Sequence, residues 1–510
     1  MSRTRSVKIN IFANYIGQAY ATFIGIVVFP LYLQYLGAEA YGLVGFFVVM
    51  NTVLCILDVG MSPMLNREIA AARADEQKRA RFRTLLRSVE ILFIAFSLAV
   101  VSVMYALSGW ISTHWLNVEA LDLHEVAQCV KLMSIMFGLR FFSAIYRSGL
   151  GGVEAQVSMN SASITIATLK AVGALAILRW VSTAPLDFFL YQFIIACLEP
   201  ALLGFLFYRQ LPDTPRPGLV FSWKVLRPAL PFAMGVAYTA SIWIFITQLD
   251  KLLLSGILPL SEYGYFAIVA SISSGVVQLS GPIANAVLPR MTYLLSGSDE
   301  PGMRTLYRKA SQVVAAIILP ITLTIAYYGT ELIYAWTGNH TAADWGGPIL
   351  FWYMMGNAFL ALMSFQYYLQ FAHGNLKLYV KMNTYLLLFA SPLIVFAAYQ
   401  YGALGTSVSW FIIQLSCFLV WPFVIHRKFA PGLHKAWLSK DLFPVALGTV
   451  LGILLATRFP EDALSNMSRP VLFMTLIGLG LVVLACASAG SSYLRGYAFS
   501  TIKKVKGILA

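Results

Sequence analysis

The stretch ADEQKRARFRTLLRSVEILFIAFSLAVVSVMYAL, residues 74–107, decides the fold class. Its first part carries five Lys or Arg residues, whereas residues 91–107 contain no charged residue. With the residues just before it, this apolar run is long enough to cross a bilayer, which takes about 20 residues of helix. Lipid offers the backbone no hydrogen-bond partners, so such a segment must be helical. We therefore expect a membrane helix next to a strongly basic loop.

The whole chain shares the composition of this stretch. Of its 510 residues, 59% are hydrophobic and only 11% are charged, and the mean hydropathy is +0.74. A soluble chain has about 25% charged residues. The composition therefore excludes a soluble multidomain protein. Basic cytoplasmic loops explain the net charge of +14 better than nucleic-acid binding does.

Fourteen apolar segments are candidates for membrane helices, which predicts an all-α membrane protein. The fifth, which carries Lys170, and the thirteenth, which is short, are the weakest. The first lacks a cleavage site with small residues, so we expect a retained helix and not a signal peptide. The segments cover residues 10–34, 41–64, 85–108, 125–149, 158–180, 187–208, 229–254, 263–288, 310–328, 347–371, 382–402, 404–426, 442–459 and 470–489.

The charges of the loops predict the orientation in the membrane. With the N-terminus inside, the predicted cytoplasmic segments contain 29 of the 36 Lys and Arg residues. The predicted external loops contain only Arg469. Basic residues gather on the cytoplasmic side, so the pattern predicts an even number of spans with both termini in the cytoplasm. The external loops reach at most about 18 residues, which leaves no room for an extramembrane catalytic domain.

The two halves of the chain share landmarks in the same order. YLGAEAYGLVGF (35–46) corresponds to ILPLSEYGYFAI (257–268), and the Tyr-Gly pairs at 41–42 and 263–264 match at an offset of 222. Six helices in each half then have the same orientation. Parallel repeats of this kind suggest two lobes that rock around a shared central cavity. The alternative is an old duplication without moving parts.

The repeat predicts the domain organisation. We expect an N-terminal lobe of helices one to six at 1–210 and a C-terminal lobe of helices seven to twelve at 229–428. The segment 211–228 between them is rich in proline and basic residues and is expected to lie along the cytoplasmic membrane surface. An extra helix pair and a cytoplasmic tail follow at 429–510.

Charged residues inside predicted spans mark the candidate functional site, because placing a charge in hydrocarbon costs about 2.5–3.5 kcal/mol. Arg140, Lys170 and Glu199 lie at similar depth in three successive helices, and Arg147 follows Arg140 on the same helix face. They predict a cationic lining that suits a phosphate or pyrophosphate headgroup. Alternatively, Glu199 pairs with Arg140 or Lys170 to hold the bundle together, which still leaves one cation unpaired.

Three acidic residues, Glu199, Asp250 and Asp58, are candidates for coupling an ion. For Asp250, pairing with Lys251 or Lys131 explains the residue equally well. For Asp58 we favour a structural role, because an Asp can satisfy backbone donors where a helix kinks or ends. Glu90, which follows the basic loop, is expected to pair with Arg83 or Arg87.

The first predicted helix has a polar stripe of Asn10, Asn14, Gln18 and Thr22, spaced by four residues. We include Asn14 and Gln18 among the candidate substrate-binding residues. Hydrogen bonding of the stripe to a neighbouring helix is an equal alternative.

The sequence contains no pattern typical of a cofactor or metal site. The five cysteines lie in apolar stretches without a close pair, so we predict neither disulfides nor a metal site. A nucleotide-binding loop of the G-x-x-x-x-G-K-[ST] type is missing from the sequence. We expect no cofactor, no catalytic residues and no direct use of ATP by this chain.

The first helix with Asn14, then LGAEAYGL (36–43), then LDVGMSPMLNR (57–67) resemble the Wzx-type polysaccharide-transport flippases. These belong to the multidrug/oligosaccharidyl-lipid/polysaccharide exporter superfamily. The resemblance covers the whole chain in layout and is sharp over about 60 N-terminal residues. It implies two six-helix lobes arranged as a V, with alternating access and a cationic cavity. Arg140 and Lys170 match that cavity in character, although neither falls on a family motif.

The resemblance also implies a substrate and a location. Such flippases move an undecaprenyl-pyrophosphate-linked oligosaccharide from the inner to the outer leaflet of the bacterial inner membrane. The product serves assembly of O-antigen, capsule or exopolysaccharide. Membrane lipids and the polysaccharide polymerase machinery are the other expected partners, and nucleic acid is not.

Two other functions fit the layout less well. Cation-coupled drug exporters of the same superfamily usually have twelve helices and often an acid in the first. This sequence predicts fourteen helices and no such acid. A membrane polysaccharide polymerase or ligase needs an external active site, for which the short loops leave no room. We therefore expect a transporter and not an enzyme.

Overall fold

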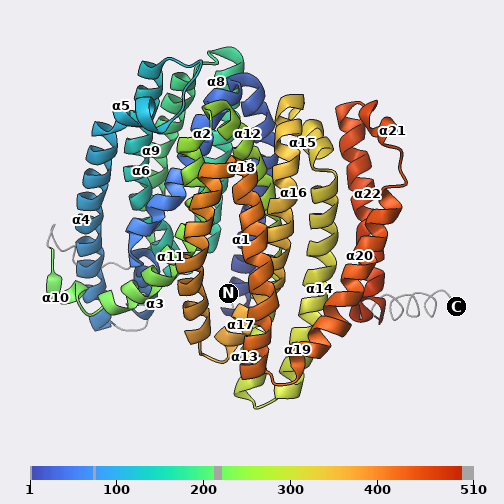
Figure 1. Cartoon of the computed structure of the whole chain (residues 1–510). Helices are drawn as coiled ribbons and strands as arrows, with labels where there is room; N and C mark the ends of the chain where they lie inside the picture. Colours follow the sequence, from blue (N-terminus) through green and yellow to red (C-terminus); the bar gives the residue numbers. More distant parts are fainter. Residues whose placement is uncertain (1–2, 73–75, 212–220, 497–510) are drawn as a thin grey trace. The chain divides into compact units, whose positions relative to one another are not determined.

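The computed structural model describes residues 3–72, 76–211 and 221–496, whose elements are α-helices with short 3-10 and π-helical turns (Figure 1). Thirteen helices in these residues are long and apolar enough to cross a membrane. The chain is therefore an all-helical, multi-pass membrane protein. It divides into two compact units, Met1–Gly264 and Tyr265–Ala510.

Unit 1 begins with long helices joined by short turns. Its elements are α1 (Arg3–Leu36), α2 (Ala38–Leu54), η1 (Cys55–Asp58), α3 (Met61–Ala72), α4 (Glu76–Ala106), α5 (Ser108–Trp110), η2 (Ile111–Trp115), α6 (Leu123–Gly152), α7 (Gln156–Thr168), η3 (Leu169–Gly173), α8 (Ala174–Trp180), α9 (Pro185–Gln210), α10 (Trp223–Leu226) and α11 (Leu230–Ile257). Helix α12 (Leu260–Gln278) starts in unit 1 and continues into unit 2.

Unit 2 contains the remaining helices. They are α13 (Ser280–Ser296), α14 (Glu300–Tyr327), α15 (Gly329–Thr337), α16 (His340–Leu362), α17 (Ser364–Ala372), α18 (Lys377–Phe429), α19 (Leu433–Ala436), η4 (Trp437–Leu442), α20 (Phe443–Ala456), α21 (Glu461–Ser465) and α22 (Arg469–Gly490). In this unit α20 and α22 pack side by side, and α14 packs against both (Figure 1).

The contacts group α11 with unit 1, where it packs against α2 and α3. The predicted lobes follow the sequence repeat and not these contacts, so the lobe boundary stays a prediction. Of the predicted connector, residues 212–220 lie outside the described part of the chain. The part after them forms α10, and the backbone N–H of Ser222 donates to Ser88 Oγ of α4 at 3.0 Å.

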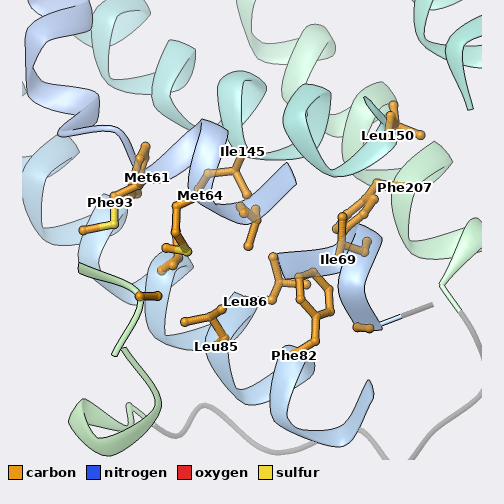
Figure 2. Close-up of a cluster of buried hydrophobic side chains, with 14 of the residues drawn as sticks. Met61, Met64, Ile69, Phe82, Leu85, Leu86, Phe93, Ile145, Leu150 and Phe207 are labelled. Atoms are coloured by element: carbon orange, nitrogen blue, oxygen red, sulfur yellow. The ribbon is translucent and has the colours of Figure 1, made fainter. Parts of the chain in front are cut away.

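A hydrophobic cluster fixes the short helix α3 in unit 1 (Figure 2). Met64 and Ile69 of α3 are buried against Phe82 of α4, Ile145 of α6 and Phe207 of α9. In a membrane, close packing and not transfer out of water stabilises such contacts. The cluster thus sets the positions of α6 and α9, which carry Arg147 and Glu199.

Three predicted spans are each broken into two helices. After α2 and η1, Val59 (φ 48°) and Gly60 (φ 69°) adopt left-handed backbone conformations before α3 begins. A Cβ on Gly60 would collide with the carbonyl oxygen of Ala233, so both its φ angle and its neighbour require glycine. The predicted span 263–288 breaks at Leu279, between α12 and α13, and the predicted span 347–371 breaks at Met363, between α16 and α17. At both residues the backbone stays right-handed. Hydropathy did not show these breaks because the sequence stays apolar through them.

The eleventh and twelfth predicted segments form one continuous element, α18, of 53 residues. Within it, Gly402 has a non-helical backbone conformation, with φ 57° and ψ −141°. The break coincides with the boundary predicted at residue 403.

The Tyr-Gly landmarks of the two halves meet within unit 1. A Cβ on Gly42 would collide with the carbonyl oxygen of Leu260, and a Cβ on Gly264 would collide with the carbonyl oxygen of Ala38. Ala38 and Leu260 differ by the same 222 positions as the two glycines. The contacts are therefore reciprocal, as an approximate two-fold axis between the repeats requires. Each contact needs a residue without a side chain, which explains why the landmark contains glycine.

Unit 2 contains a buried ionic cluster that sequence analysis did not single out. Asp441 is fully buried in η4, and its carboxylate accepts hydrogen bonds from Arg308 Nε at 2.7 Å and Nη2 at 2.9 Å. Gln312 Nε2 donates to the same carboxylate at 2.7 Å. Gln312 Oε1 accepts from Ser491 Oγ at 2.8 Å and from the backbone N–H of Tyr493 at 3.1 Å. The cluster ties α14 to η4 and to the chain that follows α22.

The glycine contact predicts an unusual response to alanine. Gly42→Ala should lower the free energy of unfolding by about 1–3 kcal/mol, because the opposing carbonyl belongs to the backbone and cannot turn aside. The loss would outweigh the gain of about 1 kcal/mol that alanine brings to an open helix position. Thermal unfolding in detergent measures the effect. The matched control is Gly235→Ala in α11, where the added Cβ has no neighbour within 4 Å. Equal stability of Gly42→Ala and wild type would contradict the contact.

Removal of the buried carboxylate tests the second cluster. Asp441→Ala leaves Arg308 and Gln312 without their acceptor, so we expect the free energy of unfolding to fall by about 2–3 kcal/mol. The partial exposure of Arg308 keeps the loss moderate. Glu300→Ala on the same helix α14 is the control. Its ion pair with Arg304 is 3.4 Å long and 63% of the Glu300 side chain is exposed, so the loss should stay below about 1 kcal/mol. Similar melting temperatures of the two variants would refute the importance of the buried pair.

Candidate functional site

Glu199 binds two cations in unit 1. Its Oε1 lies 2.9 Å from Arg147 Nη2, and its Oε2 lies 2.6 Å from Lys170 Nζ. Arg147 Nη1 also donates to Ser163 Oγ at 2.7 Å. The three charged residues come from α6, η3 and α9. The predicted pairing of Glu199 with Lys170 is confirmed, whereas the second partner is Arg147 and not Arg140.

This cluster has one net positive charge and is accessible from outside the helix bundle. The side chains of Arg147 and Lys170 are 42% and 35% exposed, and that of Glu199 is 16% exposed. All three residues lie in helices that are candidate membrane spans. A charge that faces lipid is expensive, and intramembrane charges therefore normally face a polar interior. The exposed parts of these cations thus favour a water-filled surrounding.

A π-helical turn, Leu169–Gly173, presents Lys170. Such a turn removes backbone carbonyls from the regular helical hydrogen-bond pattern. Neighbouring side chains satisfy them here. Tyr32 Oη donates to the carbonyls of Lys170 and Ala171 at 3.1 and 3.2 Å, and Gln192 Nε2 donates to that of Lys170 at 3.1 Å. Sequence analysis missed Tyr32 and Gln192, because tyrosine and glutamine at ordinary helix positions carry no signal of this role.

Arg140 stands apart from the ion pairs. It is exposed in α6, and the contact recorded for its side chain is with Cys55 Sγ, 3.9 Å from Nη2. Within the described residues no carboxylate lies at ion-pair distance from it. Arg140 precedes Arg147 by seven residues, two helical turns, so both side chains lie on one face of α6. Together with the Glu199 cluster, Arg140 brings the local charge to +2.

The polar stripe of α1 runs beside α7. Asn14 Oδ1 accepts from Asn160 Nδ2 at 2.6 Å, which is the helix-to-helix hydrogen bond that one of our alternatives proposed. Gln18 is exposed, and its backbone carbonyl accepts from Thr22 Oγ1 at 3.0 Å. The side chain of Asn10 lies outside the described part of the structure. Asn14 thus has a structural partner, and Gln18 remains accessible.

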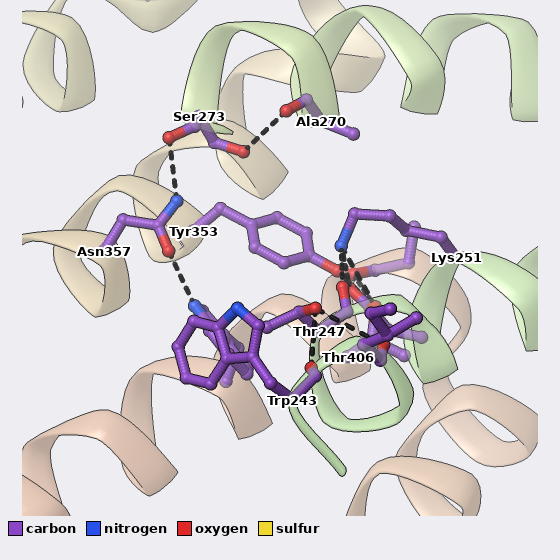
Figure 3. A network of polar contacts seen from close by, with 12 residues as sticks. Trp243, Thr247, Lys251, Ala270, Ser273, Tyr353, Asn357 and Thr406 are labelled. Atoms are coloured by element: carbon purple, nitrogen blue, oxygen red, sulfur yellow. Dashed lines mark hydrogen bonds and ion pairs between the residues drawn. The ribbon is translucent and has the colours of Figure 1, made fainter. Parts of the chain in front are cut away.

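Asp250 of α11 is buried beside Lys251. Lys251 Nζ lies 3.1 and 3.3 Å from the two carboxylate oxygens of Asp250, and it also donates to the carbonyl of Thr247 at 2.7 Å (Figure 3). Of the predicted partners for Asp250, Lys251 is therefore confirmed. This ion pair accounts for the burial of both residues without a bound ion.

Two further acidic residues have structural partners. Asp58 accepts hydrogen bonds from the backbone N–H of Ser62 at 3.2 Å and from Ser62 Oγ at 2.6 Å, which satisfies donors at the start of α3. Glu90 Oε2 lies 2.7 Å from Arg87 Nη1, as one of the two predicted pairings, and its Oε1 accepts from Tyr208 Oη at 2.5 Å. Both arrangements favour the structural interpretation of these carboxylates.

Among the described residues, no three His, Cys, Asp or Glu side chains gather in a way that could hold a metal ion. All five cysteines are free. The chemistry of the site is therefore that of guanidinium, ammonium, carboxylate and amide groups.

Comparison with known proteins gives the family and the fold. A family model described as polysaccharide biosynthesis protein matches residues 7–295, more than half of the chain. A Shigella flexneri protein assigned as an O-antigen transporter is 22% identical over 410 residues, which cover 78% of this chain and 93% of the relative.

Two solved structures show the same fold. The lipid II flippase MurJ in an inward closed conformation matches with a TM-score of 0.69 at 16% identity, over 94% of this chain and 98% of that protein. A multidrug resistance MATE family transporter of the MOP superfamily in an inward-facing conformation matches with a TM-score of 0.60 at 13% identity, over 82% of this chain and 96% of that one. The MOP fold thus extends over nearly the whole chain.

The shared carboxylate predicts coupling between its two cations. Glu199→Gln leaves Arg147 and Lys170 next to a neutral amide, so we expect the free energy of unfolding to fall by about 1–2 kcal/mol, limited by solvent screening of the exposed cations. Lys170→Met alone should also destabilise, by less. The double variant with Glu199→Gln and Lys170→Met should lose less stability than the sum of the two single losses, because the removed cation no longer repels Arg147. Additive losses in thermal melts would show that the two pairs are independent.

Proposed function

Because the chain belongs to the polysaccharide biosynthesis protein family, we propose that it is a flippase for a lipid-linked oligosaccharide. The proposed substrate is an undecaprenyl-pyrophosphate-linked oligosaccharide, which moves from the inner to the outer leaflet of the bacterial inner membrane. It then enters surface polysaccharide assembly as O-antigen, capsule or exopolysaccharide. The assigned role of the Shigella flexneri relative supports this substrate class.

The excess of positive charge inside the spans of unit 1 carries the proposal. Arg140, Arg147 and Lys170 share a single nearby carboxylate, Glu199, in helices that are candidate membrane spans. Guanidinium groups bind phosphate oxygens through paired hydrogen bonds, and an ammonium group adds a mobile point charge. A pyrophosphate would therefore neutralise the positive charge that Glu199 does not balance. On α1, the amides of Asn14 and Gln18 would contact the polar part of the substrate.

The proposed topology has an even number of spans, with both termini on one side of the membrane. A helix rises about 1.5 Å per residue, so 53 residues of α18 would measure about 80 Å, far more than the roughly 30 Å of hydrocarbon. The break at Gly402 supports two crossings, which with the other twelve spans makes fourteen. The charge alternation then places both termini in the cytoplasm. The two six-helix repeats at 1–210 and 229–428 would be the lobes that move.

Of the three candidate ion-coupling groups, Glu199 fits the proposal best. Asp58 and Asp250 have partners that explain them structurally. Protonation of Glu199 would release Arg147 and Lys170 together, which would couple proton uptake to headgroup binding. The proposed partners beyond the substrate are membrane lipids and the polysaccharide polymerase machinery.

A cation-coupled multidrug exporter is the second candidate, because the MATE transporter shares the fold. The surplus of cations at Arg140, Arg147 and Lys170 would repel cationic drugs, which favours the anionic lipid. A membrane polymerase or ligase is set aside, since the chain is a transporter of the MOP superfamily fold and not an enzyme.

Charge reversal tests the proposed headgroup site. Arg140→Glu or Lys170→Glu should abolish glycan export in cells while the protein remains in the membrane, because the local charge falls from +2 to 0. Export is measured as surface polysaccharide, and membrane content by immunoblot. Arg458→Glu, at an exposed position after α20, reverses a charge outside the cluster and should export normally.

Reconstitution separates the two candidate transporters. In liposomes, the wild type should move a labelled lipid-linked oligosaccharide between leaflets, and Lys170→Glu should not. Normal export by either charge-reversal variant would overturn the site. Failure with several glycans, together with efflux of cationic dyes, would favour the drug exporter.

A further inference from the structure

Unit 2 contains a chain of three side chains that the proposed function does not use. Tyr307 Oη lies 2.7 Å from Nε2 of His426, and Nδ1 of His426 lies 3.2 Å from Nδ1 of His434. The residues come from α14, from the last turn of α18 and from α19. Tyr307 and His426 are fully buried, whereas His434 is half-buried. The chain thus leads from the interior of unit 2 towards its surface.

The contact between the two histidines joins nitrogen to nitrogen, so one nitrogen must carry a hydrogen and the other must not. In the neutral state, the arrangement is fixed once the tyrosine donates. Tyr307 O–H donates to Nε2 of His426, His426 Nδ1–H donates to Nδ1 of His434, and His434 carries its hydrogen on Nε2. Both hydrogen bonds of this state run outward from the buried tyrosine.

Two buried side chains next to Tyr307 can accept a hydrogen bond. Within the described residues, Ser311 Oγ and both amide atoms of Gln366 have no hydrogen-bond partner, although both residues are at least 95% buried. Both lie close to the Tyr307 hydroxyl, and Phe365 packs edge-on against the tyrosine ring. A buried polar group without a partner is costly, so these atoms call for a donor. In the neutral state, the Tyr307 hydrogen points away from them.

We propose that Tyr307, His426 and His434 form a proton-binding relay. One proton from solution adds to Nδ1 of His434, which becomes an imidazolium and donates to Nδ1 of His426. While these contacts are open, His426 releases its Nδ1 proton to water and takes up another from water at Nε2, so that its own proton count is unchanged and Nε2–H donates to Tyr307 Oη. The Tyr307 O–H then turns to Gln366 Oε1 or Ser311 Oγ. One proton is taken up, no covalent bond between heavy atoms changes, and every hydrogen bond reverses its direction.

The position of the charge in the protonated state follows from burial. A cation on the fully buried His426 would lose its hydration, whereas half-buried His434 keeps part of it. The Trp437 ring lies against both imidazoles, with centroids 5.1 and 5.9 Å away. An aromatic face stabilises a neighbouring cation. The positive charge therefore stays on His434, and only the hydrogen-bond direction passes inward.

The charged residues around the relay leave no competing carboxylate among the described residues. Asp441 of η4 is held by Arg308 and Gln312, so it does not pair with either histidine. Helix α17 contributes Phe365 and has no charged residue. On α14, Glu300 pairs with Arg304, and Arg304 also donates to the carbonyl of Pro431 just before α19. The remaining charged groups on the elements that pack here are basic: Lys309 of α14, Arg427 and Lys428 of α18, Lys435 of α19 and Lys440 of η4. The relay therefore responds to solution protons and not to an internal acid.

The proposal does not depend on the transported substrate, and neither does its test. Full-length protein with ¹⁵N-labelled histidine, in lipid bilayers, gives nitrogen signals that separate imidazolium and the two neutral tautomers. His426→Gln and His434→Gln assign the two sets of signals. Between about pH 8 and pH 5, His434 should become an imidazolium, and Nδ1 of His426 should change from the protonated to the unprotonated type at the same midpoint.

Two variants distinguish a relay from mere proximity. Gln366→Leu removes an acceptor for the reversed Tyr307 hydroxyl, so the common midpoint should move by about one pH unit towards acid. Gln414→Leu, another buried amide three turns before His426 on α18, should leave it unchanged. His373→Gln controls for the loss of a histidine. The hydrogen bond of His373 Nδ1 is with the carbonyl of Leu369.

The wild-type spectra alone keep the proposal falsifiable if a variant fails to fold. A His426 that keeps one tautomer while His434 titrates would overturn the relay. The absence of any imidazolium signal from these two residues at pH 5 would overturn the proton site itself. A joint change at one midpoint, sensitive to Gln366 and insensitive to Gln414, is the result that we expect.

Discussion

A carboxylate inside a membrane span must find its partners within the protein, because hydrocarbon supplies none. The acidic side chains in the spans meet this constraint with different partners. Asp58 accepts from the start of the next helix, and Glu90 pairs with a cation one turn before it. Asp441 of η4 accepts from Arg308 and Gln312 of α14. These hydrogen bonds and ion pairs make up the polar interior of each unit. The helix breaks and π-helical turns lie beside them.

The glycine contact adds a second constraint, which is steric. Gly42 and Gly264 allow two backbones to approach at positions related by the sequence repeat. Close approach through small residues is a common way to hold helices together where no hydrophobic effect acts between them. The reciprocal arrangement turns a weak sequence similarity into a physical relation between the two halves. It also explains why both halves have glycine, and not another small residue, at this place.

Sequence reasoning predicted what depends on polarity summed over many residues. Span positions, the basic loops and the pairing of Glu199 with Lys170 followed from hydropathy and charge. Sequence reasoning failed where the backbone dihedral angles of a few residues determine the local structure. The π-helical turn at Lys170 and the break at Leu279 occur inside apolar sequence, so no window of composition reveals them. The break after Asp58, by contrast, lies where the structural role expected for Asp58 placed a kink or a helix end. Asp441 was overlooked for a related reason, since it follows a basic loop and was counted as outside the span.

The two ionic clusters differ in charge balance and in exposure, and this difference separates a structural ion pair from a candidate binding site. Asp441 is wholly buried, with one cation and one amide that satisfy it through fixed hydrogen bonds. Glu199 is shared by two partly exposed cations, and Arg140 nearby on α6 adds a third that no described carboxylate neutralises. A structural pair gains most when charge is balanced and dry. A binding site for an anion needs the opposite, namely unbalanced charge that solvent or a ligand can reach. The surplus of positive charge in unit 1 is thus costly to stability, which supports the proposal that an anionic group binds there.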